Sequence, residues 1–442
     1  MKRTITLLSL LLITVAANAW VSMSTGLTGG KVKAMVMFNN KMIVAGDFSN
    51  FKRVAQFDGT TWSQVGDGLG SGSDRINCLV VHNSKLYAGG YFSATGMGTT
   101  CSNIAVYDPT TQLWKAIGTG LNGEVNCLYS DGTNLLAGGN FSFRVATLNS
   151  TATAMVQFGP SSAFTGNVFD IQKLNNYYYV TGQLVYNATQ YALGKIDLSG
   201  TTFNAINLGF SGPGYGYALE STGSSLYIGG VFTYQGNYGI LAYDGTSAST
   251  IPYKLDPGDT VLSLLYYGGA LYGGGTFNKC SSNGTILNHF FKYQVGKPIS
   301  AVDGGFNGDI YSIAFNSTSS YFVAGGNFTA ASGSNANCVA RSNGSTIGID
   351  ELESMVTEQS VYPNPVILNA TMHFTTKEYL KNASLIILDP QGKLVSTMPA
   401  QQGANNLNID FNFNRQGLAA GIYYYMLTSD NSKAATGKFI IQ

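Results

Sequence analysis

Apolar and polar residues alternate along the chain in short runs that are separated by turn residues. Within residues 76–118, INCLVV and LYAGGYF are joined by the turn HNSK, and NIAVYD and LWKAIG by a second turn that begins PTT. Alternation with a period of two is typical of half-buried strands, and Asp-Pro or Asp-Gly at the joints favours hairpins. The pattern predicts a unit of four antiparallel strands.

The second strand of this unit carries a Gly-Gly pair, and cognates of this phrase occur seven times. Successive phrases are 43 to 51 residues apart and end at Phe48, Phe92, Phe141, Leu184, Phe232, Phe277 and Phe328. A period in the forties with strand-like content is typical of propeller blades, each of which is a four-stranded sheet. Glycine weakens a strand, so the pair indicates places where neighbouring backbones crowd together.

The N-terminal segment is predicted to close the ring of blades. The fourth strands WSQVGDGL (62–69) and WKAIGTGL (114–121) have no counterpart after CVARSNGST (338–346), but WVSMSTGL (20–27) is the same phrase. A strand at Trp20 that pairs beside the Val339 strand would complete the last blade and remove an exposed sheet edge. Residues 20–346 are therefore expected to form a seven-bladed, all-β propeller.

The first 19 residues have the layout of a secretory signal. Lys2 and Arg3 precede an apolar run and the small residues Ala17-Asn18-Ala19, which predicts cleavage before Trp20. The apolar run is too short to span a bilayer, so we expect no transmembrane segment. Removing Lys2 and Arg3 from the 24 Lys and Arg leaves 22 against 23 Asp and Glu. A charge this close to zero gives no electrostatic reason to bind nucleic acid.

The predicted propeller offers few groups for catalysis. Glu124 and Glu220 are its only glutamates, and His82 and His289 its only histidines. Glycoside hydrolysis needs two carboxylates across the scissile bond. Aspartates that precede turns are better explained as turn caps than as acid–base groups; they are Asp58, Asp108, Asp131 and Asp244. We expect no catalytic residue and no cofactor.

The five cysteines favour no metal site. They form no CxxC motif and no cluster with histidine, and two of them occupy matching places in INCLVV and VNCLYS. Small buried residues are the simpler explanation. The cysteines are Cys78, Cys101, Cys127, Cys280 and Cys338.

The tyrosines of the predicted propeller are better candidates for ligand binding than its few ionisable groups are for catalysis. Tyr186, Tyr191, Tyr215, Tyr234 and Tyr238 lie in or beside predicted inter-strand loops. Exposed aromatic rings stack on sugars or anchor protein partners. These five are the predicted ligand-binding residues. The alternative is that strand alternation places them between blades as packing.

The repeat ends at Ile349, and the chain changes character. The acidic stretch IDELESMVTEQS lies in a predicted linker over residues 347–360. Alternating runs with turn residues between them then predict a small Ig-like β-sandwich over residues 361–442.

Two resemblances add to these predictions. The Gly-Gly strands resemble kelch-like and galactose-oxidase-like propellers, which supports the fold rather than an activity. Copper chemistry of the galactose-oxidase kind requires paired histidines, and the two here lie in different units.

The tail resembles the type A sorting domain of type IX secretion in the Bacteroidetes. The matching residues are Tyr362-Pro363-Asn364-Pro365, Asp389-Pro390-Gln391-Gly392-Lys393, Gly421-Ile422-Tyr423 and Gly437-Lys438.

The second resemblance implies partners and a destination. The translocon would read the tail, a sortase-like peptidase would remove it, and the protein would pass through the periplasm to the outer cell surface or be released. We expect a monomeric, surface-displayed propeller that binds a glycan or a surface protein without catalysis. The alternatives are a polysaccharide-degrading lyase or glycoside hydrolase that acts from the loop face, and a structural spacer.

Overall fold

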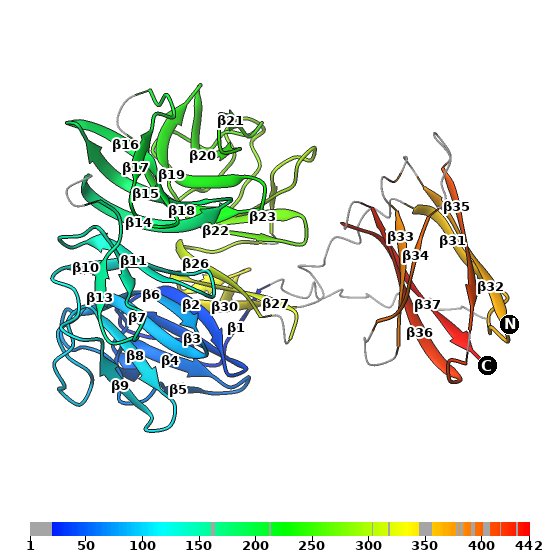
Figure 1. Ribbon diagram of the computed structural model, residues 1–442, viewed down its shortest axis with the longest axis horizontal. Coiled ribbons are helices and arrows are strands. Elements are labelled where there is room, and N and C mark those ends of the chain that lie inside the picture. Colours follow the sequence, from blue (N-terminus) through cyan, green and yellow to red (C-terminus); the bar gives the residue numbers. More distant parts are fainter. Residues whose placement is uncertain are drawn as a thin grey trace, which may run out of the picture. The chain divides into compact units, whose positions relative to one another are not determined.

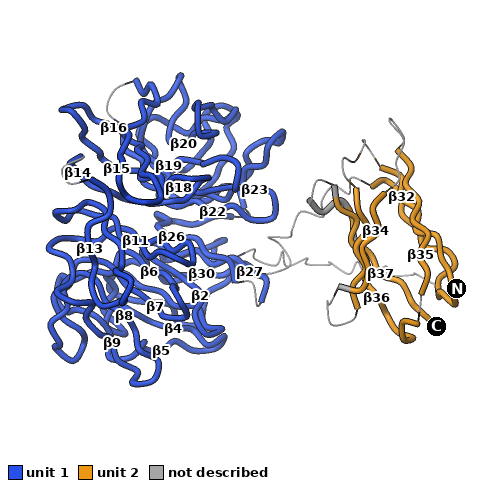
Figure 2. The backbone as a smooth tube through the Cα atoms, viewed as in Figure 1, with its two compact units in different colours: residues 1–347 blue, residues 348–442 orange. Residues whose placement is uncertain are grey.

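The fold was obtained as a computed structural model of the 442-residue chain. It divides into two compact units, residues 1–347 and 348–442 (Figure 2). The structure describes residues 20–160, 164–211, 214–302, 304–316, 319–343, 356–376, 380, 383–389, 394–400, 407–415, 417–429 and 432–442. The predicted signal at residues 1–19 lies outside the described residues.

Seven four-stranded antiparallel sheets make up the first unit, and we call them blades 1 to 7 (Figure 1). Blade 1 contains β2 (Val32–Phe38), β3 (Lys41–Gly46), β4 (Val54–Phe57) and β5 (Trp62–Gln64). Blade 2 contains β6 (Arg75–His82), β7 (Lys85–Tyr91), β8 (Ile104–Asp108) and β9 (Leu113–Ala116). Blade 3 contains β10 (Glu124–Ser130), β11 (Leu135–Asn140), β12 (Val145–Leu148) and β13 (Met155–Gln157). A 3-10 segment, Asn50–Arg53, precedes β4.

Blades 4 to 6 follow the same order. Blade 4 contains β14 (Thr165–Leu174), β15 (Tyr177–Tyr186), β16 (Thr189–Asp197) and β17 (Phe203–Ile206). Blade 5 contains β18 (Tyr215–Ser221), β19 (Leu226–Tyr234), β20 (Asn237–Tyr243) and β21 (Ala248–Thr250). Blade 6 contains β22 (Val261–Tyr267), β23 (Ala270–Gly275), β24 (Phe290–Tyr293) and β25 (Ser300–Ala301). A separate hairpin consists of β28 (Ala330–Ala331) and β29 (Ser334–Asn335).

Blade 7 joins the two ends of the repeat. It contains β26 (Asp309–Asn316), β27 (Tyr321–Asn327), β30 (Val339–Ser342) and β1 (Trp20–Ser22). β1 pairs antiparallel with β30, and Trp20 lies opposite Ser342. The Trp20 ring is fully buried against Phe290 and Phe306. The N-terminal strand therefore takes the outer place in the last blade, as the sequence predicted.

The first strand of every blade is innermost, and these strands form a closed ring. Each contacts the first strands of both neighbouring blades, from β2 through β6, β10, β14, β18, β22 and β26 back to β2. Each also carries a β-bulge at the same place in its register. The extra residues, here called the axial bulge residues, are Lys33, Asn77, Asn126, Phe169, Tyr217, Leu262 and Tyr311.

The Gly-Gly pair packs where the inner strands crowd together. A Cβ atom on the first glycine of blade 6, Gly274, would lie 2.4 Å from Ile310 Cγ2 in blade 7. A Cβ atom on the second, Gly275, would lie 2.0 Å from the Thr260 carbonyl oxygen, just ahead of the bulge in the same blade. The missing side chain of the first glycine thus lets the next blade pack closely, and that of the second lets the inner strand of the same blade approach.

The second unit contains two sheets. One has the order β31 (Val356–Tyr362), β32 (Asn369–Thr376), β35 (Asn408–Asn414), and the other β34 (Leu394–Pro399), β33 (Ser384–Leu388), β36 (Gly421–Ser429), β37 (Ser432–Ile441). Buried side chains of both sheets share one core, including Met372, Phe374, Phe411 and Phe439. The sandwich is therefore present, and its Ig-like character stays a prediction.

The end of the predicted linker needs a correction. Strand β31 begins at Val356, inside the range 347–360 that we had assigned to the linker. Val356 pairs with Thr376 and is buried in the core of the sandwich. The acidic and polar residues around it concealed this edge strand because five of its seven residues are exposed.

None of the described segments forms a long apolar helix of the kind that spans a bilayer.

Candidate binding face of the propeller

The five predicted tyrosines lie at one edge of blades 4 and 5. Tyr186 ends β15 and Tyr191 lies near the start of β16, while Tyr215 begins β18, Tyr234 ends β19 and Tyr238 lies near the start of β20. In an antiparallel sheet the end of the second strand and the starts of the first and third strands share one edge. The structure therefore places all five on the same face of the propeller.

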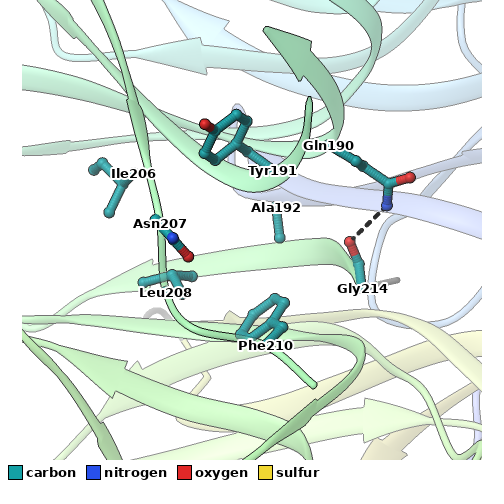
Figure 3. A pocket seen from close by; sticks show the side chains of 8 residues that line it. All are labelled: Gln190, Tyr191, Ala192, Ile206, Asn207, Leu208, Phe210 and Gly214. Atoms are coloured by element: carbon teal, nitrogen blue, oxygen red, sulfur yellow. Dashed lines mark hydrogen bonds between the residues drawn. The ribbon is translucent and has the colours of Figure 1, made fainter. Parts of the chain in front are cut away.

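A cavity of about 270 Å³ opens on this face between blade 4 and the segment that leads to blade 5 (Figure 3). Of the predicted tyrosines, Tyr191 lines it. The lining residues are Gln190, Tyr191, Ala192, Ile206, Asn207, Leu208, Phe210 and Gly214. None of these eight side chains is charged, so the cavity offers aromatic, aliphatic and amide contacts.

Hydrogen bonds and ring packing hold the cavity wall in place. Gln190 Nε2 donates to the Gly214 carbonyl oxygen at 3.2 Å and ties the β15–β16 hairpin to the segment before β18 (Figure 3). The Phe210 ring stacks on Phe232 of blade 5, with centroids 4.5 Å apart and planes 8° from parallel. The site is therefore built across the seam between two blades.

The other four tyrosines contribute less to this cavity. Tyr234 is only 8% exposed and its hydroxyl donates to the Ala248 carbonyl oxygen, so most of its ring is used in packing. Tyr186 is half-buried, and its ring packs against Tyr191 and Phe203. Tyr215 and Tyr238 are half-exposed and do not line the cavity.

The axial bulge residues form a second group that the sequence analysis did not find. They contact one another across blades: Lys33 Nζ donates to Asn77 Oδ1 at 3.1 Å, and Phe169 stacks on Tyr217 with centroids 4.9 Å apart. A signal was present in the sequence, because each follows the last apolar or glycine position before the bulge and recurs with the blade period. The sequence alone could not identify these residues as bulges, because a bulge is defined by the pairing register of two strands.

A charged network lies beside this ring. Arg75 Nε and Nη2 donate to the two carboxylate oxygens of Glu124 at 2.7 and 2.6 Å, and Asn77 Nδ2 donates to Glu124 Oε1 at 2.7 Å. Burial by itself would raise the pKa of Glu124, but the hydrogen bonds from Arg75 and Asn77 outweigh it and lower that pKa. Glu124 is thus an ionised pairing partner and not a candidate general acid.

Two other carboxyl groups join neighbouring blades. Asp170 in blade 4 accepts the Leu219 N–H of blade 5 at 2.8 Å, and Glu220 in blade 5 accepts the Tyr266 N–H of blade 6 at 2.9 Å. Burial raises the pKa of each to about 7. Neither lines the cavity, so their raised pKa values point to a structural role at the blade seams.

These two carboxyls predict that the propeller loses stability as the pH rises. Their pKa values are about 7 in the folded chain and near 4 when unfolded, so between those values the folded state holds protons that the unfolded state has released. We expect the melting temperature to fall by at least about 2 °C between pH 5 and pH 8. The variant Asp170→Asn/Glu220→Gln should show a flatter profile, whereas Asp244→Asn should not. Parallel profiles for all three proteins would contradict this account.

The predicted sorting residues surround the C-terminal strand. Asn364 Oδ1 accepts the Ile440 N–H at 2.9 Å, so the segment Tyr362-Pro363-Asn364-Pro365 lies against β37. Tyr362 itself is 79% exposed.

The remaining sorting residues lie on β36 and β37. Tyr423 is buried and donates to the Ala419 carbonyl oxygen, and Gly421 begins the same strand. Gly437 leaves room for the Tyr425 hydroxyl, while Lys438 is exposed. Gly392 lies outside the described residues.

Sequence comparison identifies a part of each unit. Residues 68–159 match the family described as the Rax2 C-terminal beta propeller domain, and residues 360–442 match the secretion system C-terminal sorting domain. No curated protein matches the chain.

Two solved structures are similar at 10% sequence identity. The computationally designed Ika8 protein has a TM-score of 0.42, with 95% of this chain and 99% of that chain covered. YjhT has a TM-score of 0.40, with 62% and 97% covered. The two family matches show that the chain is a β-propeller protein with a C-terminal sorting domain of the type IX secretion system, which indicates export to the cell surface or secretion.

Proposed function

We propose that the exported propeller binds an uncharged glycan, without catalysis, in the cavity between blades 4 and 5. The observation that carries the proposal is the lining: Tyr191 and Phe210 provide apolar ring faces, and Gln190 and Asn207 provide amides. Sugars present apolar C–H faces together with hydroxyl groups, so this combination is complementary to them. The volume, about 270 Å³, lies near the lower end of the range for small-ligand pockets.

The lining also separates this proposal from its competitors. A stable protein partner would need an interface of roughly 1,000 Å² or more, and a cavity this small suits a sugar unit better. A glycoside hydrolase would need a pair of carboxylates on either side of the bond, and none of the eight lining residues is acidic. The hydrolase alternative is tested by the same experiment as the binding of sugars.

The cavity predicts a selective loss of binding when Tyr191 is truncated. Purified chain would be screened on a panel of neutral polysaccharides, and the best ligand titrated by calorimetry. Tyr191→Ala should weaken affinity about tenfold or more, because truncating an aromatic residue that anchors a ligand costs about 2 kcal/mol or more. Tyr238→Ala, on the same face but outside the lining, is the matched control and should bind normally.

Two results would contradict this function. Equal affinity of Tyr191→Ala and the native chain would remove the cavity from the binding site. New reducing ends or unsaturated sugars in the same incubations would favour the hydrolase or lyase instead. Melting curves of both variants show whether a loss of binding reflects a loss of folding.

A further inference from the structure

Two ammonium groups at the propeller axis have no anionic partner among the described residues. Lys31 lies just before the innermost strand β2 and Lys33 at its bulge, and neither forms an ion pair with a described carboxylate. Lys33 Nζ donates to Asn77 Oδ1, and Lys31 Nζ approaches the Tyr311 hydroxyl at 3.4 Å. Both contacts are to neutral groups.

The nearby carboxylates accept hydrogen bonds from other groups, and no described carboxylate forms an ion pair with Lys31 or Lys33. Glu124 accepts from Arg75 and Asn77, and Asp47 Oδ1 accepts the backbone N–H of Lys31. Asp309 Oδ2 accepts from the Tyr311 hydroxyl at 3.2 Å. Burial lowers the pKa of Lys33, as expected for a cation whose lost hydration is not fully replaced. An added anion would supply the missing partner.

The opposite part of the ring of axial bulge residues is apolar. Phe169, Tyr217 and Leu262 belong to blades 4, 5 and 6, and the first two rings are stacked at an interplanar angle of 23°. Tyr311, Lys33, Asn77 and Asn126 belong to blades 7, 1, 2 and 3. The ring therefore has a polar, cationic arc facing an aromatic one.

We infer that the axial ring is a second binding site, for a sugar that bears a carboxylate, such as a uronic acid unit of an acidic polysaccharide. The carboxylate pairs with Lys33 and Lys31, and the apolar face of the sugar ring lies against Tyr217 and Phe169. A simple anion would leave the aromatic arc unused, and a neutral sugar would leave the ammonium groups unpaired. This site is separate from the cavity between blades 4 and 5 and does not depend on the function proposed for it.

The test uses the full chain and two forms of one probe. A short oligogalacturonate and the same oligosaccharide with methyl-esterified carboxyls are titrated into the protein by calorimetry. We expect the acid to bind at least about tenfold more tightly than the ester and to weaken as salt is added. Lys33→Met should remove this preference, whereas Lys85→Met, an exposed lysine at the other end of the blades, should keep it.

Further variants locate the site. Tyr217→Leu should weaken binding of the acid, whereas Tyr191→Ala, which belongs to the cavity, should leave binding of the acid unchanged. Equal binding of acid and ester, or an unchanged preference in Lys33→Met, would overturn the inference, as would a failure of the acid to bind. If Lys33→Met does not fold, the comparison of acid and ester on the native chain still decides the matter.

Discussion

Replacing Gly275 by alanine is expected to destabilise the propeller by about 3 kcal/mol or more. The new Cβ atom would lie 2.0 Å from the Thr260 carbonyl oxygen, a backbone atom just before the inner strand β22 that cannot rotate away as a side chain would. The backbone must shift, and the shift would disturb the bulge at Leu262 that follows. Overpacking of this kind ranks among the larger single-residue effects. Chemical denaturation followed by tryptophan fluorescence would measure it.

A second glycine variant separates the steric effect from the loss of glycine itself. Gly296 lies in an exposed turn with no atom within 4 Å of an added Cβ, but its φ is +80°. Gly296→Ala should therefore cost about 1–2 kcal/mol, the penalty for a left-handed conformation. If Gly275→Ala costs no more than this control, the close approach of the inner strand is not what requires the glycine.

Replacing Asp131 by alanine is expected to cost about 2–3 kcal/mol, because it breaks a half-buried ion pair with Lys173 and a charged hydrogen bond from Tyr178. Asp131 Oδ2 accepts from Lys173 Nζ at 2.9 Å and from the Tyr178 hydroxyl at 2.7 Å, and its side chain is only 7% exposed. The same carboxylate caps its own turn by accepting the Asn134 N–H. Its loss would leave Lys173 and Tyr178 of blade 4 without this partner. The measurement is again the free energy of unfolding.

The effect of this substitution should depend on pH. Burial alone would raise the pKa of Asp131, but the hydrogen bonds from Asn134, Tyr178 and Lys173 outweigh it and hold the pKa well below its usual value. The stabilisation is therefore present above about pH 4, where the unfolded carboxyl is ionised, and is lost as the pH falls further. The native chain and Asp131→Ala should converge in stability in strong acid.

A turn of the same kind serves as the comparison. Asp244 caps an exposed turn through Thr246 and Ser247, and within the described part of the chain it bonds to no other blade. Asp244→Ala should therefore lose far less stability than Asp131→Ala. Similar losses would mean that turn capping, and not the link between blades 3 and 4, accounts for the role of Asp131.

Much of the fold could be predicted because the chain repeats itself. The Gly-Gly strand and the Trp-containing fourth strand recur at similar spacing, so the missing strand after Val339 and the spare one at Trp20 were visible together. Local alternation and turn chemistry were sufficient for this, because each blade consists of consecutive hairpins. The edge strand at Val356 was missed because its side chains are mostly polar.

The candidate site was less predictable. Five tyrosines were predicted to bind a ligand, and that role stays a prediction. The structure places all five at one edge of blades 4 and 5, where Tyr191 lines the cavity and Tyr234 is buried. Exposure depends on how neighbouring blades pack, and no local pattern records it. Phe210, whose ring completes the cavity, lies in a connecting segment without alternation.

Blade 4 shows most clearly what packing contributes. Thr181 replaces the first glycine of the pair there, which in the sequence reads as a departure from the repeat. Its partner in blade 5 is Gly216, where other blades have valine or isoleucine, and a Cβ on Gly216 would lie 1.8 Å from Thr181 Oγ1. At this seam the larger side chain, Thr181, belongs to the earlier blade and the glycine to the next one, which reverses the arrangement at the seams that have a Gly-Gly pair. The close contact between the two blades is therefore preserved.

The repeat, the strand order and the sorting tail thus follow from the amino-acid sequence, because they depend on neighbours along the chain. The ring formed by Lys33, Asn77, Phe169 and Tyr217 follows from the closed structure, because its contacts join residues from different blades. Bulges turn those side chains toward one another, and a bulge is a property of two paired strands. The chemistry at the axis therefore emerges only when all seven blades meet.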